Sequence, residues 1–394
     1  MLIGIDASRA VTAQPTGSEG YSRRLIQAML TLESQRMPSA RHRFCLYVRS
    51  TPPADVFLGT GLGHTEVCVR ICAVVIPFPR LWTHVRLSWE MVRRPPDVLF
   101  VPAHVLPLVH PRASLVTIHD LGYLYFPEAH PWRQRLYLDL STRWNARTAA
   151  HILTDSEATK SDLVTRYATP PDKITVAYPG RDETLAPVRD PAEIEMVKAR
   201  YGIAGDYFLY VGTLQPRKNL ARIVAAFATL ELETVLVLAG KHGWLYDDLF
   251  AQVRRMGLEG RVLFPGYIPD KDKAALMSGA LAFVFPSLYE GFGLPVVEAQ
   301  SCGCPVIAST TSSLPKVAGD AALLVDPHDV TAIAAAMQRV VADSALRESL
   351  IERGFVNARR FSWTTCARAV LNAAEQSASE VFFRHSQDPP WPSL

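Results

Sequence analysis

The stretch Phe285-Pro-Ser-Leu-Tyr-Glu-Gly-Phe-Gly-Leu-Pro-Val-Val-Glu298 does most to decide the fold of this chain. The apolar run Ala282–Phe285 that leads into it is typical of a buried strand. A loop with two glycines follows, Pro295 suits the first position of a helix, and Gly303 can end that helix. The stretch therefore predicts a strand, a loop and a helix in succession, which is the repeating unit of a parallel α/β sheet.

Two glutamates, Glu290 on the loop and Glu298 near the helix start, give this unit its chemical character. Glycines in the loop let the backbone approach a ligand, and the N–H groups around Gly293 and Leu294 would point from a helix N-terminus at an anion. A carboxylate is unfavourable beside an anion, so both glutamates are better aimed at hydroxyl groups such as those of a sugar. The alternative is a tight turn in which a glutamate only satisfies the helix dipole.

The same alternation of short apolar runs and amphipathic stretches extends along the chain. It predicts strands at Leu2–Ile5, Phe44–Val48, Val67–Val75, Val98–Val101, Leu115–Ile118, His151–Leu153, Tyr207–Val211, Thr234–Leu238, Val262–Phe264, Ala282–Phe285, Val306–Ala308 and Ala322–Val325. It predicts helices at Tyr21–Leu32, Trp132–Thr148, Leu220–Ala228, Asp248–Met256, Lys271–Met277 and Val296–Cys302, and one long helical region at Val330–Ser377. The fold class is therefore α/β with parallel sheets.

The length of 394 residues favours two domains, because a single hydrophobic core stops growing near about 250–300 residues. The apolar rhythm lapses after Gly180, where a polar stretch carries two prolines. We therefore predict α/β domains at 1–180 and 206–365, joined by a linker at 181–205. Residues 366–394 are predicted to form a helix and a tail that cross back toward the first domain, the last residues being frayed or laid over the surface.

Apolar residues make up 48% and charged residues 20% of the sequence, which excludes a disordered, collagen-like or coiled-coil protein. No apolar run approaches the roughly 18 residues of a membrane span. The segment Met1–Asp6 has no basic residue and reaches an acid early, so it predicts a first strand, not a signal peptide, and a cytoplasmic protein. The six cysteines are scattered and are expected to be buried free thiols.

Charge is distributed unevenly along the chain. Residues 1–150 contain seventeen arginines, no lysine and ten acidic residues, a net charge of +7, whereas the whole chain carries only +3. This excess suggests an anionic partner, which is a nucleic acid, a phosphate-bearing substrate or a membrane surface. A bias toward arginine on a solvated face is the alternative.

A second loop, Tyr210-Val-Gly-Thr-Leu-Gln-Pro-Arg-Lys-Asn219, follows another predicted strand. Gly212 permits the turn, and Arg217 and Lys218 precede a helix that begins near Asn219. Two cations beside a helix N-terminus suit a diphosphate, which gains negative charge when it leaves a sugar. A basic surface loop without a ligand is the alternative.

The spacing of Glu290 and Glu298, with seven residues between them, resembles the signature of the retaining nucleotide-sugar glycosyltransferases of family 4. The wider string Pro-Ser-Leu-Tyr-Glu-Gly-Phe-Gly-Leu-Pro-x-x-Glu-Ala is similar to the mannosyltransferase-type branch that builds bacterial O-antigens and exopolysaccharides. The resemblance covers most of residues 1–370 and is densest over 207–326. It implies a GT-B fold, in which two Rossmann-like domains face a cleft, the first binding the acceptor and the second the nucleotide sugar.

The resemblance also implies a reaction. It points to a retaining, metal-independent hexosyltransferase that moves mannose from GDP-mannose to a hydroxyl of a growing, lipid-linked surface glycan. Three other functions stay open: a UDP-sugar-dependent transferase of the same family, a GT-B phosphorylase or epimerase, and an inactive relative that binds nucleotide sugars. No Gly-x-Gly-x-x-Gly follows the first strand, which argues against an ordinary dinucleotide-binding dehydrogenase.

The family's roles transfer to matching positions of this chain. Glu290 is expected to contact the donor sugar, Glu298 the ribose hydroxyls, and Arg217 with Lys218 the diphosphate. His119, directly after the strand Leu115–Ile118, is expected beside the donor sugar, although from the residues alone a histidine there is more often structural. Its neighbour Asp120 either orients the imidazole or caps a turn. The expected catalytic residues are therefore Glu290, His119 and Lys218, and no metal ligand is expected.

The resemblance implies further donor contacts at Gly17, Gly212, Phe292, Gly293, Leu294, Lys241, Gly266, Tyr267 and Ile268. The sequence departs from the family pattern at three positions. Gly20 stands where arginine is common, Thr213 where some members have arginine, and Lys316 where glutamate is usual. The spacing of Asp270 and Asp272 fits a metal-binding pair, but members of this family use that loop to start a helix.

The basic first domain fits a lipid-linked acceptor. Arginines interleave with tryptophans in one part of it, at Arg80, Arg86, Arg93, Arg94, Arg133 and Arg135 and at Trp82, Trp89 and Trp132. Such a set predicts a peripheral contact with an anionic membrane. With a lipid-linked acceptor, no nucleic-acid partner is expected. The alternative is a set of core-facing tryptophans with exposed arginines.

Overall fold

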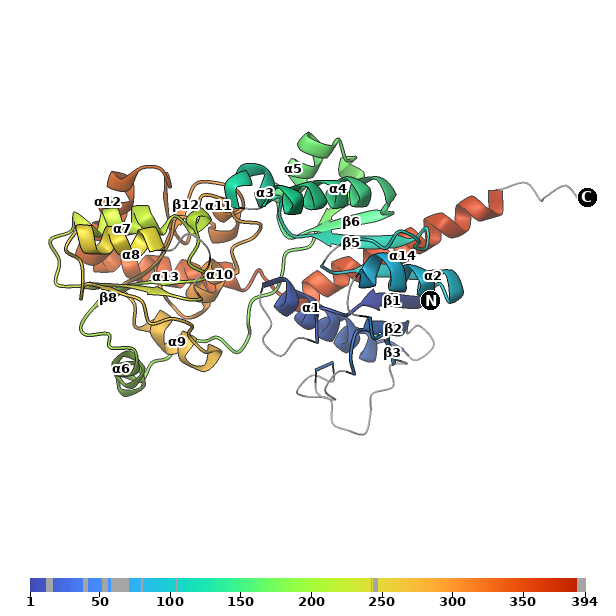
Figure 1. Ribbon diagram of the computed structural model, residues 1–394. Helices are drawn as coiled ribbons and strands as arrows, with labels where there is room; N and C mark the ends of the chain where they lie inside the picture. The colour runs from blue at the N-terminus through green and yellow to red at the C-terminus, as the bar shows by residue number, and fades with distance from the viewer. Residues whose placement is uncertain are drawn as a thin grey trace, which may run out of the picture. The chain divides into compact units, whose positions relative to one another are not determined.

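The computed structural model describes residues 1–11, 17–37, 42–51, 56–57, 71–78, 81–103, 105–129, 131–241, 243 and 247–387. The chain forms two compact units, each with its own parallel sheet and hydrophobic core (Figure 1). Unit 1 comprises residues 1–121, 132–180 and 362–394. Unit 2 comprises residues 122–131 and 181–361.

Unit 1 contains a seven-stranded sheet in the order β3-β2-β1-β4-β5-β6-β7. The strands are β1 (Leu2–Asp6), β2 (Arg43–Val48), β3 (Ile71–Val75), β4 (Val98–Val101), β5 (Ser114–Ile118), β6 (His151–Thr154) and β7 (Ile174–Val176). All neighbouring pairs are parallel. The central strands are buried on both faces, as parallel strands covered by helices are, and this explains their unbroken apolar runs.

The helices of unit 1 include one segment from the far end of the sequence. They are α1 (Gly17–Ser34), the π-helix η2 (Trp82–Leu87), α2 (Ser88–Arg93), α4 (Trp132–Thr148), α5 (Glu157–Tyr167), η4 (Pro171–Lys173) and α14 (Trp363–Gln387). Apolar side chains of α14 share one core with α1 and with strands β1, β2 and β4. Gly180 lets Trp363 approach closely, because a Cβ at Gly180 would lie 2.2 Å from the Trp363 backbone nitrogen.

Unit 2 contains a six-stranded sheet in the order β10-β9-β8-β11-β12-β13. The strands are β8 (Tyr207–Val211), β9 (Val235–Ala239), β10 (Val262–Leu263), β11 (Ala282–Phe285), β12 (Val306–Ser309) and β13 (Leu323–Val325). The order reverses between β8 and β11, as it does between β1 and β4 in unit 1. Such a reversal is the point where doubly wound sheets bind ligands at the carboxyl ends of their strands.

Helices cover both faces of this sheet, with α7, α8 and α12 on one side and α9 on the other (Figure 1). The helical segments of unit 2 are α3 (Gly122–Tyr125), η3 (Pro127–Ala129), α6 (Pro191–Arg200), η5 (Pro216–Lys218), α7 (Leu220–Ala228), α8 (Asp247–Arg255), α9 (Asp270–Ser278), α10 (Leu294–Ser301), α11 (Leu314–Ala318), α12 (Val330–Ala342) and α13 (Ser344–Ala358). Tyr125 stacks on Tyr289 with ring centroids 4.8 Å apart, which fixes the short segment 122–131 on this unit.

The structure confirms the α/β class and the predicted strands, and corrects several details. The long helical region predicted at Val330–Ser377 is three helices, α12, α13 and α14. Asp343 makes the first break, because it ends α12 and caps α13, its side chain accepting from the Leu346 N–H. The polar stretch predicted as a linker contains α6, which Asp190 caps and Pro191 begins. The short strand β7 was not predicted. Residues 67–70 of the predicted strand Val67–Val75, and 388–394 of the predicted tail, lie outside the described residues.

The expectation of buried free thiols holds for four of the described cysteines, Cys45, Cys302, Cys304 and Cys366, and is wrong for Cys72, which is exposed on the edge strand β3. Cys68 lies outside the described residues. Among the described helices, none has the length and apolarity that crossing a bilayer requires. Trp82 is 1% exposed, which corrects the expectation that it joins the basic surface, whereas Trp89 and Trp132 are exposed at 55% and 66%.

Candidate functional site

The loop between β11 and α10 places Glu290 inside unit 2. Gly293 adopts a φ of +105° just before α10, and a Cβ there would lie 2.6 Å from the Leu314 side chain. Glycine is therefore required at this position on two counts, backbone conformation and space. Pro295 is the second residue of α10, and Gly303 follows the helix with a φ of +73°. The helix therefore begins and ends within two residues of the predicted range Val296–Cys302.

Two serines that sequence reasoning missed hold this loop in place. The Glu290 N–H donates to Ser312 Oγ at 2.9 Å. The Ser313 hydroxyl donates to the carbonyls of Glu290 and Phe292 at 3.0 and 2.7 Å. These bonds satisfy the polar backbone of a buried loop, which would otherwise be costly. No local pattern points to them, because they come from the loop after the neighbouring strand β12.

Glu290 is buried and carries two cationic partners. Lys218 Nζ donates to its Oε1 at 2.6 Å, and Arg217 Nη1 lies 3.3 Å from its Oε2. Burial raises the pKa of Glu290, but the Lys218 ammonium and the Arg217 guanidinium outweigh it and hold this pKa below its usual value. The carboxylate is therefore ionised at neutral pH, and the three groups together carry a net charge of +1.

The loop that carries Arg217 and Lys218 is hydrogen-bonded to the loop that carries Glu290. Arg217 Nη1 also donates to the Tyr289 carbonyl at 2.6 Å, and the Leu288 N–H donates to the Arg217 carbonyl at 3.0 Å. Asn219, with a φ of +64°, donates its amide to the carbonyls of Pro286 and Pro327. The sequence placed the two cations correctly after β8 but did not predict that Glu290 is their partner.

Glu298 lies in the second turn of α10 and has a partner of its own. Lys273 Nζ, from α9, is 3.3 Å from Glu298 Oε2 and 3.2 Å from Asp270 Oδ1. Burial lowers the pKa of Lys273, but the two carboxylates more than offset this and raise it above its ordinary value. Lys273 therefore fixes one oxygen of Glu298. This pairing joins two helices and was not predicted.

The other donor contacts expected in unit 2 gather where β8, β9 and β10 end. The Gly212 N–H donates to the Ala239 carbonyl at 2.9 Å, and the Gly240 N–H donates to the Gly266 carbonyl at 2.7 Å, so the three loops form one hydrogen-bonded edge. Exposed Lys241 lies over the ring of exposed Tyr267, with 5.1 Å from Nζ to the centroid.

The side chains of Ile268 and Phe292 are buried in unit 2, with Phe292 packed edge-on against Phe361. Only the backbone of Ile268 can therefore meet a nucleotide without displacing the core. Leu294 is half-buried at the start of α10.

In unit 1, His119 follows β5 and meets an aspartate that follows β6. His119 Nδ1 lies 2.6 Å from Asp155 Oδ2, and the edge of the Tyr21 ring packs on the imidazole at 4.7 Å between centroids. Burial lowers the pKa of His119, but the Asp155 carboxylate outweighs it and raises this pKa above its ordinary value. The ring's Nε2 is buried, and a hydrogen bond between the ring and the Pro102 backbone also raises this pKa. The carboxylate that contacts the ring nitrogen is thus that of Asp155, whereas the sequence suggested Asp120 as either an orienting group or a turn cap.

The remaining positions singled out in the sequence are Gly17 and Gly20 in unit 1 and Lys316 and Asp272 in unit 2. Gly17 is exposed as the first residue of α1, and a Cβ at Gly20 would meet nothing within 4 Å. Lys316 is exposed on α11. Asp272 binds Arg200 and the Tyr201 hydroxyl, so this half of the Asp270–Asp272 pair is a structural group that joins α6 to α9. The described residues hold no cluster of three metal-ligating side chains.

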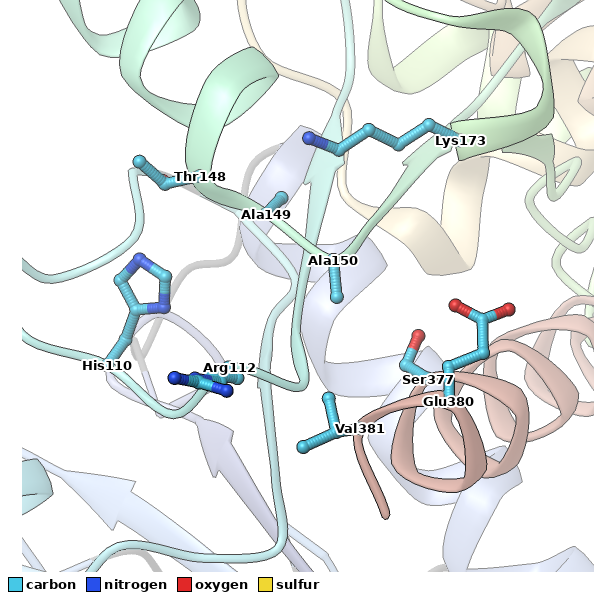
Figure 2. A pocket seen from close by; sticks show the side chains of 9 residues that line it. All are labelled: His110, Arg112, Thr148, Ala149, Ala150, Lys173, Ser377, Glu380 and Val381. Atoms are coloured by element: carbon cyan, nitrogen blue, oxygen red, sulfur yellow. The ribbon is translucent and has the colours of Figure 1, made fainter. Parts of the chain in front are cut away.

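A cavity of about 540 Å³ opens at the opposite edge of the unit 1 sheet, where β5, β6 and β7 begin. Figure 2 shows its lining side chains, which are His110, Arg112, Thr148, Ala149, Ala150, Lys173, Ser377, Glu380 and Val381. Lys173 Nζ donates to the carbonyls of Ala146 and Arg147 at the end of α4, and burial lowers its pKa. The cavity lies where these strands begin, whereas His119 and Asp155 lie where β5 and β6 end, so the cavity is separate from that site.

Comparison with known proteins identifies the class that this fold and these loops define. Residues 29–185 match the model of the family described as "Glycosyltransferase Family 4", and residues 198–356 match "Glycosyl transferases group 1". The O-antigen chain mannosyltransferase B of Escherichia coli is 38% identical over 316 residues, which are 79% of this chain and 82% of the relative. The chain therefore belongs to the family 4 glycosyltransferases and has their GT-B fold.

Other relatives agree with this assignment. The serotype-specific mannosyltransferase WbdA of Escherichia coli is 28% identical over 69% of this chain, and this chain covers 35% of its length. Among solved structures, Anabaena Alr3699/HepE in complex with UDP and glucose superposes with a TM-score of 0.70 over 95% of this chain and 99% of that chain. At 18% identity this last likeness shows the fold alone.

Proposed function

We propose that this glycosyltransferase moves mannose from GDP-mannose to a hydroxyl of a growing, lipid-linked cell-surface glycan, with retention of anomeric configuration and without a metal. The observation that carries the reaction is the buried, ionised Glu290 between Lys218 and Arg217 at the carboxyl edge of the unit 2 sheet. The mannosyltransferase names of the two relatives support the sugar.

The cationic pair is suited to the leaving group. With Glu290 ionised, the cluster keeps a net charge of +1, which favours a diphosphate over a neutral ligand. As the bond between sugar and phosphate breaks, negative charge grows on the phosphate oxygen, and fixed cations stabilise that charge without reorganising. Lys218 and Arg217 are proposed to supply this stabilisation, while Glu290 accepts hydrogen bonds from hydroxyls of the sugar.

The departing phosphate oxygen is proposed to take the proton of the acceptor hydroxyl. No protein base is then needed, which agrees with a Glu290 carboxylate held by two cations and poorly basic. His119 is proposed to contact the donor sugar, its ring held by Asp155. Glu298 is proposed to accept hydrogen bonds from the ribose hydroxyls through the oxygen that Lys273 does not occupy.

A thermal-shift panel tests the donor. The chain is heated with GDP-mannose, UDP-glucose, UDP-galactose, UDP-N-acetylglucosamine or ADP-glucose, each with and without EDTA. Ligand binding to the folded state raises the midpoint. A shift with GDP-mannose that exceeds the others and is unchanged by EDTA supports the proposal. A larger shift with a UDP-sugar would mean that the donor is that UDP-sugar and not GDP-mannose. The absence of a shift with every nucleotide sugar would reject the proposed transferase mechanism.

A further inference from the structure

The imidazole of His119 is held by hydrogen bonds that act within the plane of its ring. Asp155 Oδ2 lies 2.6 Å from Nδ1, and the ring also hydrogen-bonds to the Pro102 backbone. The Thr159 hydroxyl donates to the His119 carbonyl at 3.1 Å and holds the backbone after β5. Because the hydrogen bonds of imidazole nitrogens lie in the ring plane, they leave the ring able to tilt. A contact with another group is needed to fix that tilt.

Tyr21, near the start of α1, supplies such a contact. Its ring stands at 83° to the imidazole of His119, with the two centroids 4.7 Å apart, which is one of the arrangements that aromatic rings favour. Tyr21 is 3% exposed, so its own ring has little room to move. A fixed ring beside the imidazole restricts the tilt that the hydrogen bonds leave free.

The Tyr21 ring is itself held by two other elements of unit 1. It packs against Trp363, the first residue of α14, with ring centroids 5.6 Å apart. The Tyr21 hydroxyl lies 3.5 Å from Thr117 Oγ1 of β5 and also contacts the side chain of Cys366, one turn further along α14. Cys366 Sγ in turn donates to the Ala177 carbonyl at 3.6 Å. Tyr21 is therefore a rigid neighbour and not a side chain that only fills space.

The place of Tyr21 in α1 differs from that of the other buried residues of this helix. Leu25, Ile26 and Met29 are fully buried and pack in the core of unit 1. Tyr21 lies nearer the start of the helix, at the edge of the sheet where β1 and β5 end and where doubly wound sheets bind ligands. An aliphatic side chain could fill this volume, but it would not present a flat, rigid ring to the imidazole.

We propose that Tyr21 is a positioning residue for His119, whose imidazole it fixes in the orientation that meets the donor sugar. The inference rests on the proposed contact of His119 with that sugar. Tyr21 acts through His119, and the sugar is touched by the imidazole alone.

Two substitutions at Tyr21 test the proposal, with the release of GDP from GDP-mannose and the binding of GDP as readouts. Tyr21→Leu is expected to lower kcat about tenfold, because a loosened imidazole is misplaced for the reaction, while GDP binding stays within about twofold. Tyr21→Phe keeps the ring and is expected to keep kcat within about twofold. An unchanged kcat in Tyr21→Leu, or an equal loss in Tyr21→Phe, overturns the proposal.

Leu25→Ala is the control for a merely structural role. Leu25 lies one turn further along α1, and its truncation removes core contacts. The variant is expected to lower the midpoint of thermal unfolding at least as much as Tyr21→Leu and to keep kcat within about twofold. A loss of kcat equal to that of Tyr21→Leu would mean that loosening the core explains both, and would overturn the proposal.

His119→Ala separates the inference from the proposed function. This variant is expected to lower kcat about tenfold or more, and Tyr21→Leu added to it is expected to cost less than about a further twofold, because a positioning residue acts only through the group that it positions. A full additional loss in the double variant would overturn the positioning role and leave the sugar contact in place. An unchanged kcat in His119→Ala would reject the sugar contact, and the inference with it.

Discussion

Lys218 and Glu290, 72 residues apart in the sequence, meet through a 2.6 Å contact between Nζ and Oε1 inside unit 2. The contact joins the loop after β8 to the loop after β11, the two strands at which the order of the sheet reverses. Each group alone would be costly to bury, and together they form an ionised pair whose second cation, Arg217, leaves the cluster positive.

The first prediction concerns this pair. Lys218→Met is expected to destabilise the protein by about 2–4 kcal/mol, because it leaves a buried carboxylate without its shortest cationic contact. Denaturant unfolding at neutral pH measures the loss. Lys241→Met, which removes an exposed lysine from the neighbouring post-strand loop, is the control and is expected to change stability by less than about 0.5 kcal/mol. Equal stability of the two variants would show that Glu290 does not need Lys218 in order to stay buried.

The second prediction concerns the partner of Glu298. Lys273→Met is expected to weaken GDP binding about tenfold, because Glu298 loses the group that fixes one of its oxygens. Lys271→Met removes an exposed lysine from the same helix and is expected to leave GDP binding unchanged. Calorimetric titration of both variants measures the difference. GDP binding that is the same in both would mean that Lys273 only stabilises the fold.

The third prediction concerns pH. Asp155→Asn is expected to lower the pKa of His119, because it removes the carboxylate that favours the protonated ring. The raised pKa of folded His119 means that this interaction stabilises the protein fully below the ordinary value of 6.5 and that the stabilisation is lost as pH rises through the folded value. NMR titration of the imidazole and unfolding at several pH values check both statements. A His119 pKa that Asp155→Asn leaves unchanged would remove Asp155 from its orienting role.

The fourth prediction concerns the turn into α10. Gly293→Ala is expected to cost about 1–3 kcal/mol, because alanine is strained at a φ of +105° and its Cβ meets Leu314. Gly20→Ala is the matched control, since that position lies inside α1 with nothing near its Cβ, and alanine there is expected to stabilise by up to about 1 kcal/mol. Thermal unfolding of the two variants tests whether Gly293 is required by the backbone.

The sequence predicted elements whose cause is local. Parallel strands buried on both faces appear as apolar runs, so the run at 282–285 was identified with its observed bounds. The turn glycines Gly293 and Gly303 were also found, because a left-handed backbone favours glycine wherever it occurs. The strand β7 was missed because a threonine interrupts its three residues, Ile-Thr-Val, so it lacks the unbroken apolar run that marked the equally short strands β10 and β13.

The partners of the candidate site residues could not be predicted in the same way. Asp155 lies 36 residues after His119, and Lys273 lies 25 residues before Glu298. Each pairing depends on which strands and helices become neighbours. The aspartate next in sequence, Asp120, was the natural suggestion from spacing alone, but the partner of His119 comes from the end of the adjacent strand.

The most direct test of the account compares Glu290→Ala with Glu298→Ala, measuring GDP binding and the release of GDP from GDP-mannose on the same preparations. Glu298→Ala is expected to weaken GDP binding about tenfold or more. Glu290→Ala is expected to leave GDP binding within about threefold while lowering turnover about 10²–10³-fold, since its interactions are proposed to be with the reacting sugar. Equal losses of GDP binding in the two variants would contradict this division of roles.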